Sequence, residues 1–538
     1  MAIARRNSTY ALVTFYKHDR QGGEQIDTFD ATALETGGLL NTSLVAFTHD
    51  KRLGGTAAGA VSITLKGHQT AGIHAGEPWT NLIANGDWWA IDIVKNGTRQ
   101  GLSFGVIDTV GLAITAGAHG VGEVVVTVTG RDFGFALDDT PVYFNPFDPT
   151  IDNALGMNML AILAKVSGAP HEVLVSMLKG MMGGLAVDPG LLGGHTKVPS
   201  KLSGGAPDST FWIDHLDTTT VVQPNLRGEC FAAGAITPQG ASSVWDFLGS
   251  WRNPSMNELF IDPKPEPGLP KKALLVLREK PFVNAAGGST SPWFALRAWN
   301  VEASSIESLN LSRGANRINH ITLTGDIMPG IGNDAYGIYR PVADRESIDQ
   351  FGLRKLEEQT RYFDNTGESG FISDVKDWLF LIVSWNVLNH EYWQGSINIG
   401  ELRAEIRIGQ KVSIMDGPPA NYQGLPVGGA AARPRGWWFD VDPKALTFYV
   451  EGVSHSYTEG SNPVCSTSLL VSQGYQEGLR LSAITERVAK FRVPTGTGSA
   501  NEGELNVQTV EEDKAIDAGS QGGAEGTDDY EIAAEDEI

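Results

Sequence analysis

The clearest alternation of apolar and polar residues lies between about Gly395 and Gln473. In its first segment the apolar side chains occupy the even positions, namely Leu402, Ala404, Ile406, Ile408, Val412 and Ile414. The odd positions are polar, with Arg403, Glu405, Arg407, Lys411 and Ser413. A period of two predicts a strand that covers a core with one face and meets water with the other. Gly409 predicts a bulge or turn that divides this strand.

Two further segments of the same region alternate in the same way. In the first of them Leu446, Phe448 and Val450 are apolar, and after Gly452 the apolar parity shifts to Val453, His455 and Tyr457. One inserted residue at a β-bulge produces this shift. The last segment alternates Cys465, Thr467, Leu469 and Val471 with mostly serine neighbours. Together the three segments predict a small antiparallel sheet or barrel with one solvated face.

Residues 1–147 also have the pattern of strands separated by turns. The apolar sets are Val45 and Phe47; Val61, Ile63 and Leu65; Trp89, Ile91 and Ile93; Phe104 and Val106; and Val124, Val126 and Val128. Asn96-Gly97 is a strong hairpin-turn signal, and the glycine-rich segment Gly117–Gly122 is best explained as another hairpin. This spacing of strands predicts a sandwich or a barrel.

Helical spacing is found in several segments between these β-rich regions. We expect two helices within residues 150–183, a helix at Ser242–Trp251, a polar helical segment at Asp344–Phe363 and a long helix at Asp374–Asn389. The methionines Met157, Met159, Met177, Met181 and Met182 are explained either as adaptable core filling or as a packing surface for a neighbouring subunit. Short strands are expected at Asn257–Asp262, Ala273–Phe282 and within Leu309–Asp326, whereas residues 184–240 have no assignable pattern.

Charge and cysteine content restrict the class of protein. The chain has 538 residues and a net charge of −22, and its last 38 residues hold 13 acids and one lysine. Residues 491–538 therefore predict an acidic flexible tail whose partner carries basic patches. The excess of acidic over basic residues argues against a protein that recognises nucleic-acid sequence, because such a protein needs a basic face. Cys230 and Cys465 give no disulfide framework, and no apolar run predicts a membrane span, so we expect the chain to stay in the cytoplasm where it is made.

Candidate catalytic and binding residues form only weak patterns. His171-Glu172 lacks the second histidine of a zinc protease because position 175 is valine, and His390 and His455 lack partners at ligand spacing. Gly193–Lys197 does not have the spacing of a phosphate loop. The pair Asp138-Asp139 would suit glycoside hydrolysis only across a cleft, and Trp393, Trp437 and Trp438 are either a sugar-stacking platform or core and subunit contacts. We predict no catalytic residue, no metal site and no cofactor.

Three separated blocks nevertheless resemble one family. The first comprises "GSINIGELRAEIRIGQKVSI", "LTFYVEGVSHSYTEG" and "CSTSLLVSQG". The second is "VTVTGRDFGFALDDTPVYFNP" (Val126–Pro146), and the third is the succession of a helix, "NELFID", a hairpin and "ALLVLREKPF". These blocks span most of residues 40–475 and are similar to bacteriophage tail (baseplate) hub proteins of the late-control-D-like family, which are related to the trunk of secretion-system spikes.

The resemblance implies a mainly β fold with helical insertions (α+β), with two tail-tube-like β-barrel domains plus helical and small β domains. It divides the chain into a first barrel (1–147), a helical or irregular insertion (148–255), a β-rich middle domain (256–343), a helical connector (344–394), a C-terminal barrel (395–490) and the acidic tail (491–538).

The implied function is that of a non-enzymatic, structural hub at the tip or baseplate of a virion tail. It would be assembled in the host cytoplasm as a homotrimer that adapts a sixfold tube to a threefold spike and leaves a channel for DNA. The implied partners are further copies of the chain, a tail tube or distal tail protein, a spike or central fibre protein and a tape measure protein; DNA would pass non-specifically. Two alternatives remain, a tail-tip peptidoglycan hydrolase and a carbohydrate- or receptor-binding tail protein.

Overall fold

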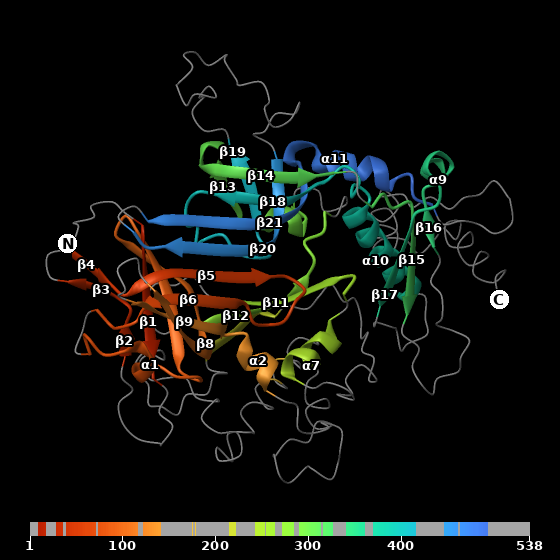
Figure 1. Ribbon diagram of the computed structural model, residues 1–538. Helices are drawn as coiled ribbons and strands as arrows, with labels where there is room; N and C mark the ends of the chain where they lie inside the picture. Colours follow the sequence, from red (N-terminus) through yellow and green to blue (C-terminus); the bar gives the residue numbers. More distant parts are fainter. Residues whose placement is uncertain are drawn as a thin grey trace, which may run out of the picture.

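The fold is mainly β with helical insertions, as the sequence predicts (Figure 1). A computed structural model describes residues 9–17, 28–35, 39–70, 74–116, 122–140, 175, 178, 215–221, 243–252, 254–263, 272–283, 290–313, 316–325, 341–360, 370–415, 446–460 and 463–492.

One sheet of 13 strands dominates the described part of the chain. Its N-terminal half contains β1 (Tyr10–Tyr16), β2 (Thr28–Asp30), β5 (Leu44–Arg52), β6 (Ala60–Lys66), β7 (Trp88–Lys95), β8 (Thr98–Ala116) and β9 (Gly122–Asp132). Its C-terminal half contains β13 (Ala298–Glu302), β14 (Ile306–Ser312), β18 (Trp393–Ile399), β19 (Lys411–Met415), β20 (Leu446–Thr458) and β21 (Val464–Gln476). The order across the sheet is β14-β18-β21-β20-β5-β6-β9-β8-β7-β1-β2, and β19 joins β20 to β13.

The two halves meet where β5 pairs with β20, a junction that we call the seam. Residues Ala46–Arg52 lie antiparallel to Gly452–Thr458. The register of β20 shifts between Val450 and Gly452, so the bulge predicted from the sequence is present. Before the bulge β20 pairs with β19, and after it β20 pairs with β5. Because a bulge bends a strand, β20 belongs to the C-terminal half at one end and to the seam at the other.

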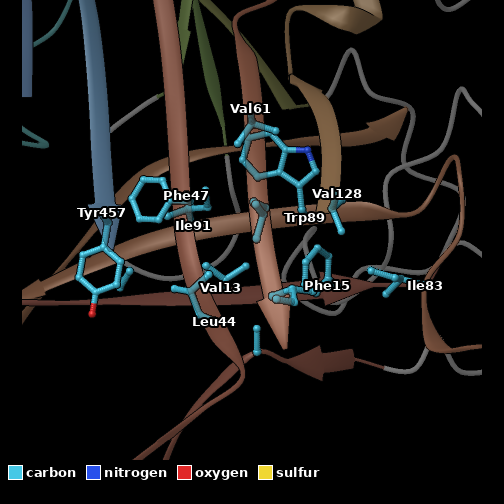
Figure 2. Packing of buried hydrophobic residues seen from close by; sticks show 14 of the residues in the cluster. Val13, Phe15, Leu44, Phe47, Val61, Ile83, Trp89, Ile91, Val128 and Tyr457 are labelled. Carbon is cyan, nitrogen blue, oxygen red and sulfur yellow. The ribbon is translucent and has the colours of Figure 1, made fainter. Parts of the chain in front are cut away.

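Each half of the sheet surrounds its own apolar core. In the N-terminal half Trp89, Ile91 and Phe15 are buried, and Tyr457 reaches into the same core from β20 (Figure 2). Backbone hydrogen bonds from Ala31 to Val13 and from Ser43 to Ala31 tie β1 to the start of β5. The core of the C-terminal half is made largely of isoleucine, valine and leucine side chains from β18 to β21, with Phe448. Burying each large apolar side chain stabilises the fold by about 1.5–3 kcal/mol.

The predicted strand through Leu402 to Ile414 is only partly correct. Leu402, Ala404, Ile406 and Ile408 are all buried, as the alternation predicts, but residues 400–410 form turns and bends, and the strand β19 begins at Lys411. The alternation shows that every second side chain is buried. A series of turns that covers a core produces the same pattern as a strand. Gly409 has φ of 72°, so the turn expected there is confirmed.

Smaller sheets and helices surround the large sheet. The sheets are β10 (Leu216–Val221) with β11 (Asn257–Pro263) and β12 (Ala273–Glu279), β15 (His320–Gly325) with β16 (Val342–Ala343) and β17 (Lys355–Thr360), and β3 (Thr32–Glu35) with β4 (Leu39–Thr42). The helices are α1 (Trp79–Leu82), α2 (Phe135–Asp139), α7 (Val244–Trp251), α8 (Pro292–Ala295), α9 (Arg345–Phe351), α10 (Gly370–Asn386) and α11 (Glu477–Val488), with the 3₁₀ turn η7 (Ala303–Ser305). Helix α10 lies beside the β15–β17 sheet, and α11 packs on α10 and on the end of β21 (Figure 1).

The helix predictions are confirmed for α7 and α10 and corrected for residues 344–363. The Ser243 side chain caps α7 by accepting a hydrogen bond from the Asp246 amide. In the corrected segment α9 ends at Phe351, since Gly352 has φ of 72°, and the chain then forms β17. Most of the helices expected within 150–183, residues 184–240 apart from 215–221, and all of the acidic tail beyond Arg492 lie outside the described residues.

Candidate functional site: a hydroxyl-covered face

Short side chains cover one face of eight neighbouring strands, β14-β18-β21-β20-β5-β6-β9-β8, which we call the hydroxyl face. Its residues, strand by strand in that order, are Ser308, Asn310 and Ser312; Ser396 and Asn398; Ser466, Ser468 and Leu470; Ser454, Ser456 and Thr458; Ala46, Thr48 and Asp50; Ala60, Ser62 and Thr64; Val125, Thr127 and Thr129; and Thr109, Gly111 and Ala113. All are exposed or half-buried.

The strand registers align these residues into rows that cross the seam. One row consists of six hydroxyl side chains in succession: Ser466, Ser456, Thr48, Ser62, Thr129 and Thr109. The next row contains Ser308, Asn398, Ser468, Ser454 and Asp50. Because side chains alternate across a strand, most of the residues between them point into the two cores, whereas Leu112 of β8 is exposed. The hydroxyl face is therefore the continuous outer side of both halves.

Hydrogen bonds between neighbouring strands hold several of these side chains. The hydroxyl oxygens of Thr109 and Thr129 are 2.6 Å apart, and those of Ser456 and Ser466 are 2.7 Å apart. On the far side of the face the Asn398 amide donates to the Ser308 hydroxyl at 2.6 Å. Such cross-strand pairs contribute roughly 0.2–1 kcal/mol each. The face therefore satisfies part of its own hydrogen-bonding capacity.

The residues that define the hydroxyl face include no aromatic ring and one charged residue, Asp50, and Leu470 is the largest apolar side chain among them. Three cations, Arg52, Lys66 and Arg131, have the same outward parity at the ends of β5, β6 and β9. Arg131 lies at the border of the face, where Asp139 and Asp108 bind its guanidinium at 2.7 and 2.9 Å. The hydrogen bonds that Arg131 donates to these two carboxylates raise its pKa. The cation at this border is thus neutralised within the chain.

Asp138 and Asp139, the acidic pair considered for glycoside hydrolysis, lie beside Arg131 at the border of the face. Asp138 accepts hydrogen bonds from the backbone amides of Ala57 and Ala58 at 3.2 and 3.0 Å, while Asp139 binds Arg131. Each carboxylate of the pair thus has a partner within the fold, and the two serve different contacts rather than facing one another across a cleft.

The other singled-out residues do not meet at a common site. His455 is buried beneath the seam, and His390 Nε2 lies 3.3 Å from Glu391. Trp393 is half-buried on β18, with the Arg313 guanidinium 4.9 Å from its ring centroid. Ala116 pairs with Gly122, so the β8–β9 hairpin predicted there is present. His171, Glu172, Gly193–Lys197, Trp437 and Trp438 lie outside the described residues.

Two searches of the described residues bear on other classes of site. No group of three or more His, Cys, Asp or Glu side chains in the described ranges is arranged to hold a metal ion. Of the helices that the structure describes, none combines the length and the apolar character needed to cross a bilayer. The sequence signal for the hydroxyl face is the Ser and Thr content of the polar positions in the alternating segments. These positions predict strands, but their shared chemistry becomes visible only when the strands are aligned.

No protein-family model matches the sequence, and no curated protein matches it. Solved structures do match, 28 chains in all. A tail protein from Neisseria meningitidis MC58 is 13% identical, with 82% of this chain and 96% of that chain covered and a TM-score of 0.39. The 43 kDa tail protein of prophage MuSo2 from Shewanella oneidensis is 11% identical, with coverages of 88% and 98% and a TM-score of 0.38.

A third similar structure is the E. coli c3393 protein, described as a component of the type VI secretion system with structural similarity to the T4 bacteriophage tail proteins gp27 and gp5. It is 8% identical, with 81% of this chain and 74% of that chain covered and a TM-score of 0.34. Because all three TM-scores are below 0.5, the function proposed below is argued from the strands and side chains of this chain.

Proposed function

We propose that the chain is a structural hub of a bacteriophage tail tip or baseplate, with its hydroxyl face turned toward an axial channel. The observation that carries this proposal is the continuity of that face: both halves of the sheet contribute strands to one wall across the seam. In a homotrimer three copies supply six half-sheets around one axis. A trimer can then meet a sixfold tube above and a threefold spike below.

The chemistry of the hydroxyl face suits the passage of DNA. Cationic side chains bind the phosphate backbone, and aromatic side chains bind unpaired bases by stacking. The rows named above supply neither group, and Asp50 repels phosphate. Of the cations at the ends of these strands, Arg131 is bound by two carboxylates, and Arg52 and Lys66 lie outside the rows. A duplex would therefore pass the wall without a site at which it is held.

The open edges of the sheet favour assembly with further copies. Beyond Asp108, β8 pairs with β9 along one edge, and no strand of the described residues pairs with its other edge. The outer edge of β14, opposite β18, also has no partner strand within the described ranges. Leu112 and Ile114 near the end of β8 are 57% and 68% exposed. Unpaired edges and exposed apolar residues are normally covered in an assembly. In this proposal β8 of one copy faces β14 of the next.

The remaining parts of the proposal follow from the family resemblance and the charge of the chain. The tail tube or distal tail protein would lie on one side of the ring and the spike or central fibre on the other, with the tape measure protein in the channel. The acidic tail would bind a basic partner. The chain would act mechanically and not as an enzyme, and it would be assembled in the host cytoplasm and carried in the virion.

Oligomeric mass is the direct test. Light scattering of the purified chain, alone and with its spike, should give three copies. Monomers under both conditions would contradict the hub. A zymogram with cell-wall substrate should remain uncleared, and clearing would favour the hydrolase alternative.

Cross-linking tests the proposed arrangement of edges. The paired substitutions Leu112→Cys and Asn310→Cys should form a link between copies with a short bis-maleimide, because the ring places β8 beside β14. The matched control Leu479→Cys with Asn310→Cys uses an equally exposed leucine on α11 and should not link. Equal linking in both pairs would reject this orientation.

A further inference from the structure

Two histidines lie opposite each other beneath the seam, on the side of the sheet that faces the cores. His49 of β5 and His455 of β20 are cross-strand partners in the register. Their ring centroids are 6.1 Å apart, and the ring planes differ by 20°. Each residue is only 2% exposed. The pair therefore spans the contact between the two halves and has no access to water in the closed state.

Neither ring is well satisfied by hydrogen bonds. Both nitrogens of His49 and Nδ1 of His455 have no hydrogen-bond partner among the described residues. His455 Nε2 lies 3.3 Å from the Arg403 carbonyl oxygen. A buried polar atom without a partner costs about 1–3 kcal/mol. A pair that existed only to pack β5 on β20 would be replaced by apolar residues at lower cost, so the histidines need another explanation.

Buried charges face the pair from the surrounding elements. On the N-terminal side Lys51 Nζ lies 2.7 Å from Asp132 Oδ2, and His49 Nε2 is 3.8 Å from the same oxygen. From the C-terminal half Arg407 donates to the Gly101 and Leu102 carbonyls at 2.8 Å and lies 3.7 Å from Asp262 of β11. The pair therefore sits among two cations and two carboxyl groups.

These charges disfavour the binding of a further proton at this site. Burial lowers the pKa of His455 well below its ordinary value, and His49 and Arg407 lower it further. Burial raises the pKa of Asp262 despite the opposing effects of Arg407 and Lys51, which favours its neutral form. The cluster is thus balanced or already positive when both rings are neutral. A proton on His455 would add positive charge beside Arg407 and His49 in a buried site.

We propose that the His49–His455 pair is an acid-sensitive lock on the seam: when β5 separates locally from β20, an exposed imidazole takes up a proton, so the separated state is favoured as the pH falls. The proton comes from solvent once the seam opens, and the open state keeps it because water then solvates the imidazolium. The hydroxyl face, which is continuous only while β5 and β20 are paired, loses its continuity at the same point. The inference rests on the seam itself and holds whether or not the chain is a tail hub.

The direction of the pH effect follows from linkage. A histidine kept neutral in the closed state and exposed in the open state takes up its proton on opening. Opening therefore becomes easier as the pH falls below about 6.5, the ordinary imidazole pKa. For one such proton the opening equilibrium increases about thirtyfold between neutral pH and pH 5.0.

Hydrogen exchange of the full-length chain at pH 7.5 and pH 5.0, corrected for intrinsic exchange rates, tests the lock. Peptides from β5 (residues 46–52) and β20 (residues 452–458) should lose about thirtyfold in protection at pH 5.0, while β15 and β17, which hold none of the residues of the cluster, keep theirs. Unchanged protection at the seam would overturn the proposal. So would a parallel loss in every element, because that is global acid unfolding and not a local release.

Variants separate the histidines from the neighbouring carboxylates. The double variant His49→Phe/His455→Phe keeps two stacked rings without a titrating group and should keep its seam protection at pH 5.0. The control His68→Phe replaces an exposed histidine that lies just after β6. The seam of this variant should open at pH 5.0 as in the unaltered chain. A double variant that still opens at pH 5.0 assigns the effect to other groups and overturns the proposal. If the double variant does not fold, the single variant His455→Phe takes its place, and unchanged wild-type protection at pH 5.0 still overturns the proposal.

Discussion

Phe47 of β5 and Tyr457 of β20 stack across the seam, with ring centroids 5.7 Å apart and ring planes 18° apart. Both are 1% exposed, and the register pairs them directly. A side chain from one half of the chain thereby completes the core of the other. The two halves are consequently coupled by apolar packing as well as by backbone hydrogen bonds.

Truncating either ring should destabilise both halves together. We expect Phe47→Ala and Tyr457→Ala each to lower the free energy of unfolding by about 3–5 kcal/mol, the usual cost of removing a buried aromatic ring. The double variant should show a coupling of about 1 kcal/mol between the rings. Urea unfolding followed by fluorescence measures these values. Phe351→Ala, at a residue that is 47% exposed, is the control and should cost less than about 1 kcal/mol.

Gly409 is required for two separate reasons, and a matched glycine separates them. Gly409 and Gly54 have φ of 72° and 76°. A Cβ at Gly409 would lie 2.6 Å from the Phe260 ring, whereas a Cβ at Gly54 would meet nothing within 4 Å. Gly54→Ala should cost only the left-handed backbone, about 1–2 kcal/mol. Gly409→Ala should cost about 1–3 kcal/mol more because it also overpacks the core. Equal losses of Tm for the two variants would contradict this account.

Local patterns in the sequence predicted the strands well. The parity shift at Gly452 predicted the bulge because one inserted residue changes which side chains reach the core. Asn96-Gly97 predicted the β7–β8 turn because both residues adopt positive φ, 52° and 79°. The bulge and the turn depend only on residues that are close in sequence, so each can be predicted from a single segment.

Strand pairings and side-chain contacts between distant segments could not be predicted from any one segment. The pairing of β5 with β20 joins residues about 400 positions apart, and nothing in either strand specifies the other. The apolar parity of His455 predicts its burial, which is confirmed, but its partner His49 could not be predicted because the pair exists only in the register. Leu402 to Ile408 were assigned to a strand because turns over a core bury alternate residues as a strand does. The hydroxyl face likewise requires eight strands to be aligned.

Lys51 and Asp132 form a buried ion pair whose effect should appear at lower pH than that of the seam histidines. Burial opposes ionisation of Asp132, but Lys51 and His49 outweigh it and lower the pKa of its carboxyl. The pair therefore stabilises the fold above the unfolded-state value of about 3.9, and this contribution is lost as the pH falls through the lowered folded-state value. Acid titration of the unfolding free energy should show this loss below about pH 4.

Removing the lysine should reverse the sign of that dependence. Lys51→Met leaves the buried Asp132 carboxylate without its lysine and with the Gly134 amide as its remaining hydrogen-bond donor at 3.0 Å, which costs about 3–5 kcal/mol at pH 7. Its folded-state pKa then lies above the unfolded value, so the variant should regain stability relative to wild type as the pH falls from 7 toward 4. Lys51→Met/Asp132→Asn should recover part of the loss at pH 7 and show no such dependence. A Lys51→Met curve parallel to wild type would show that the ion pair does not stabilise the fold.

Arg480 of α11 connects that helix to the large sheet through a fork that lysine cannot reproduce. Its side chain is fully buried, and Nη2 donates to the Gln473 and Thr447 carbonyls at 2.7 and 3.1 Å. The guanidinium lies 4.0 Å from the Trp293 ring centroid. An ammonium provides neither the planar stacking nor two fixed donors. Arg480→Lys should therefore cost about 1–3 kcal/mol and reduce hydrogen-exchange protection in α11 and at the end of β21.

The same helix supplies the control for this substitution. Arg487 is 37% exposed and binds Glu391 at 3.1 Å near the surface. Because exposed ion pairs contribute about 0–1 kcal/mol, Arg487→Lys should leave the Tm almost unchanged. Both substitutions keep the charge of α11, so any difference between them reports the buried geometry around Arg480 and not the net charge. If the two variants unfold at the same temperature, the stacked arginine does not hold α11 on the sheet, and the apolar contacts of Ile484 and Val488 must do so instead.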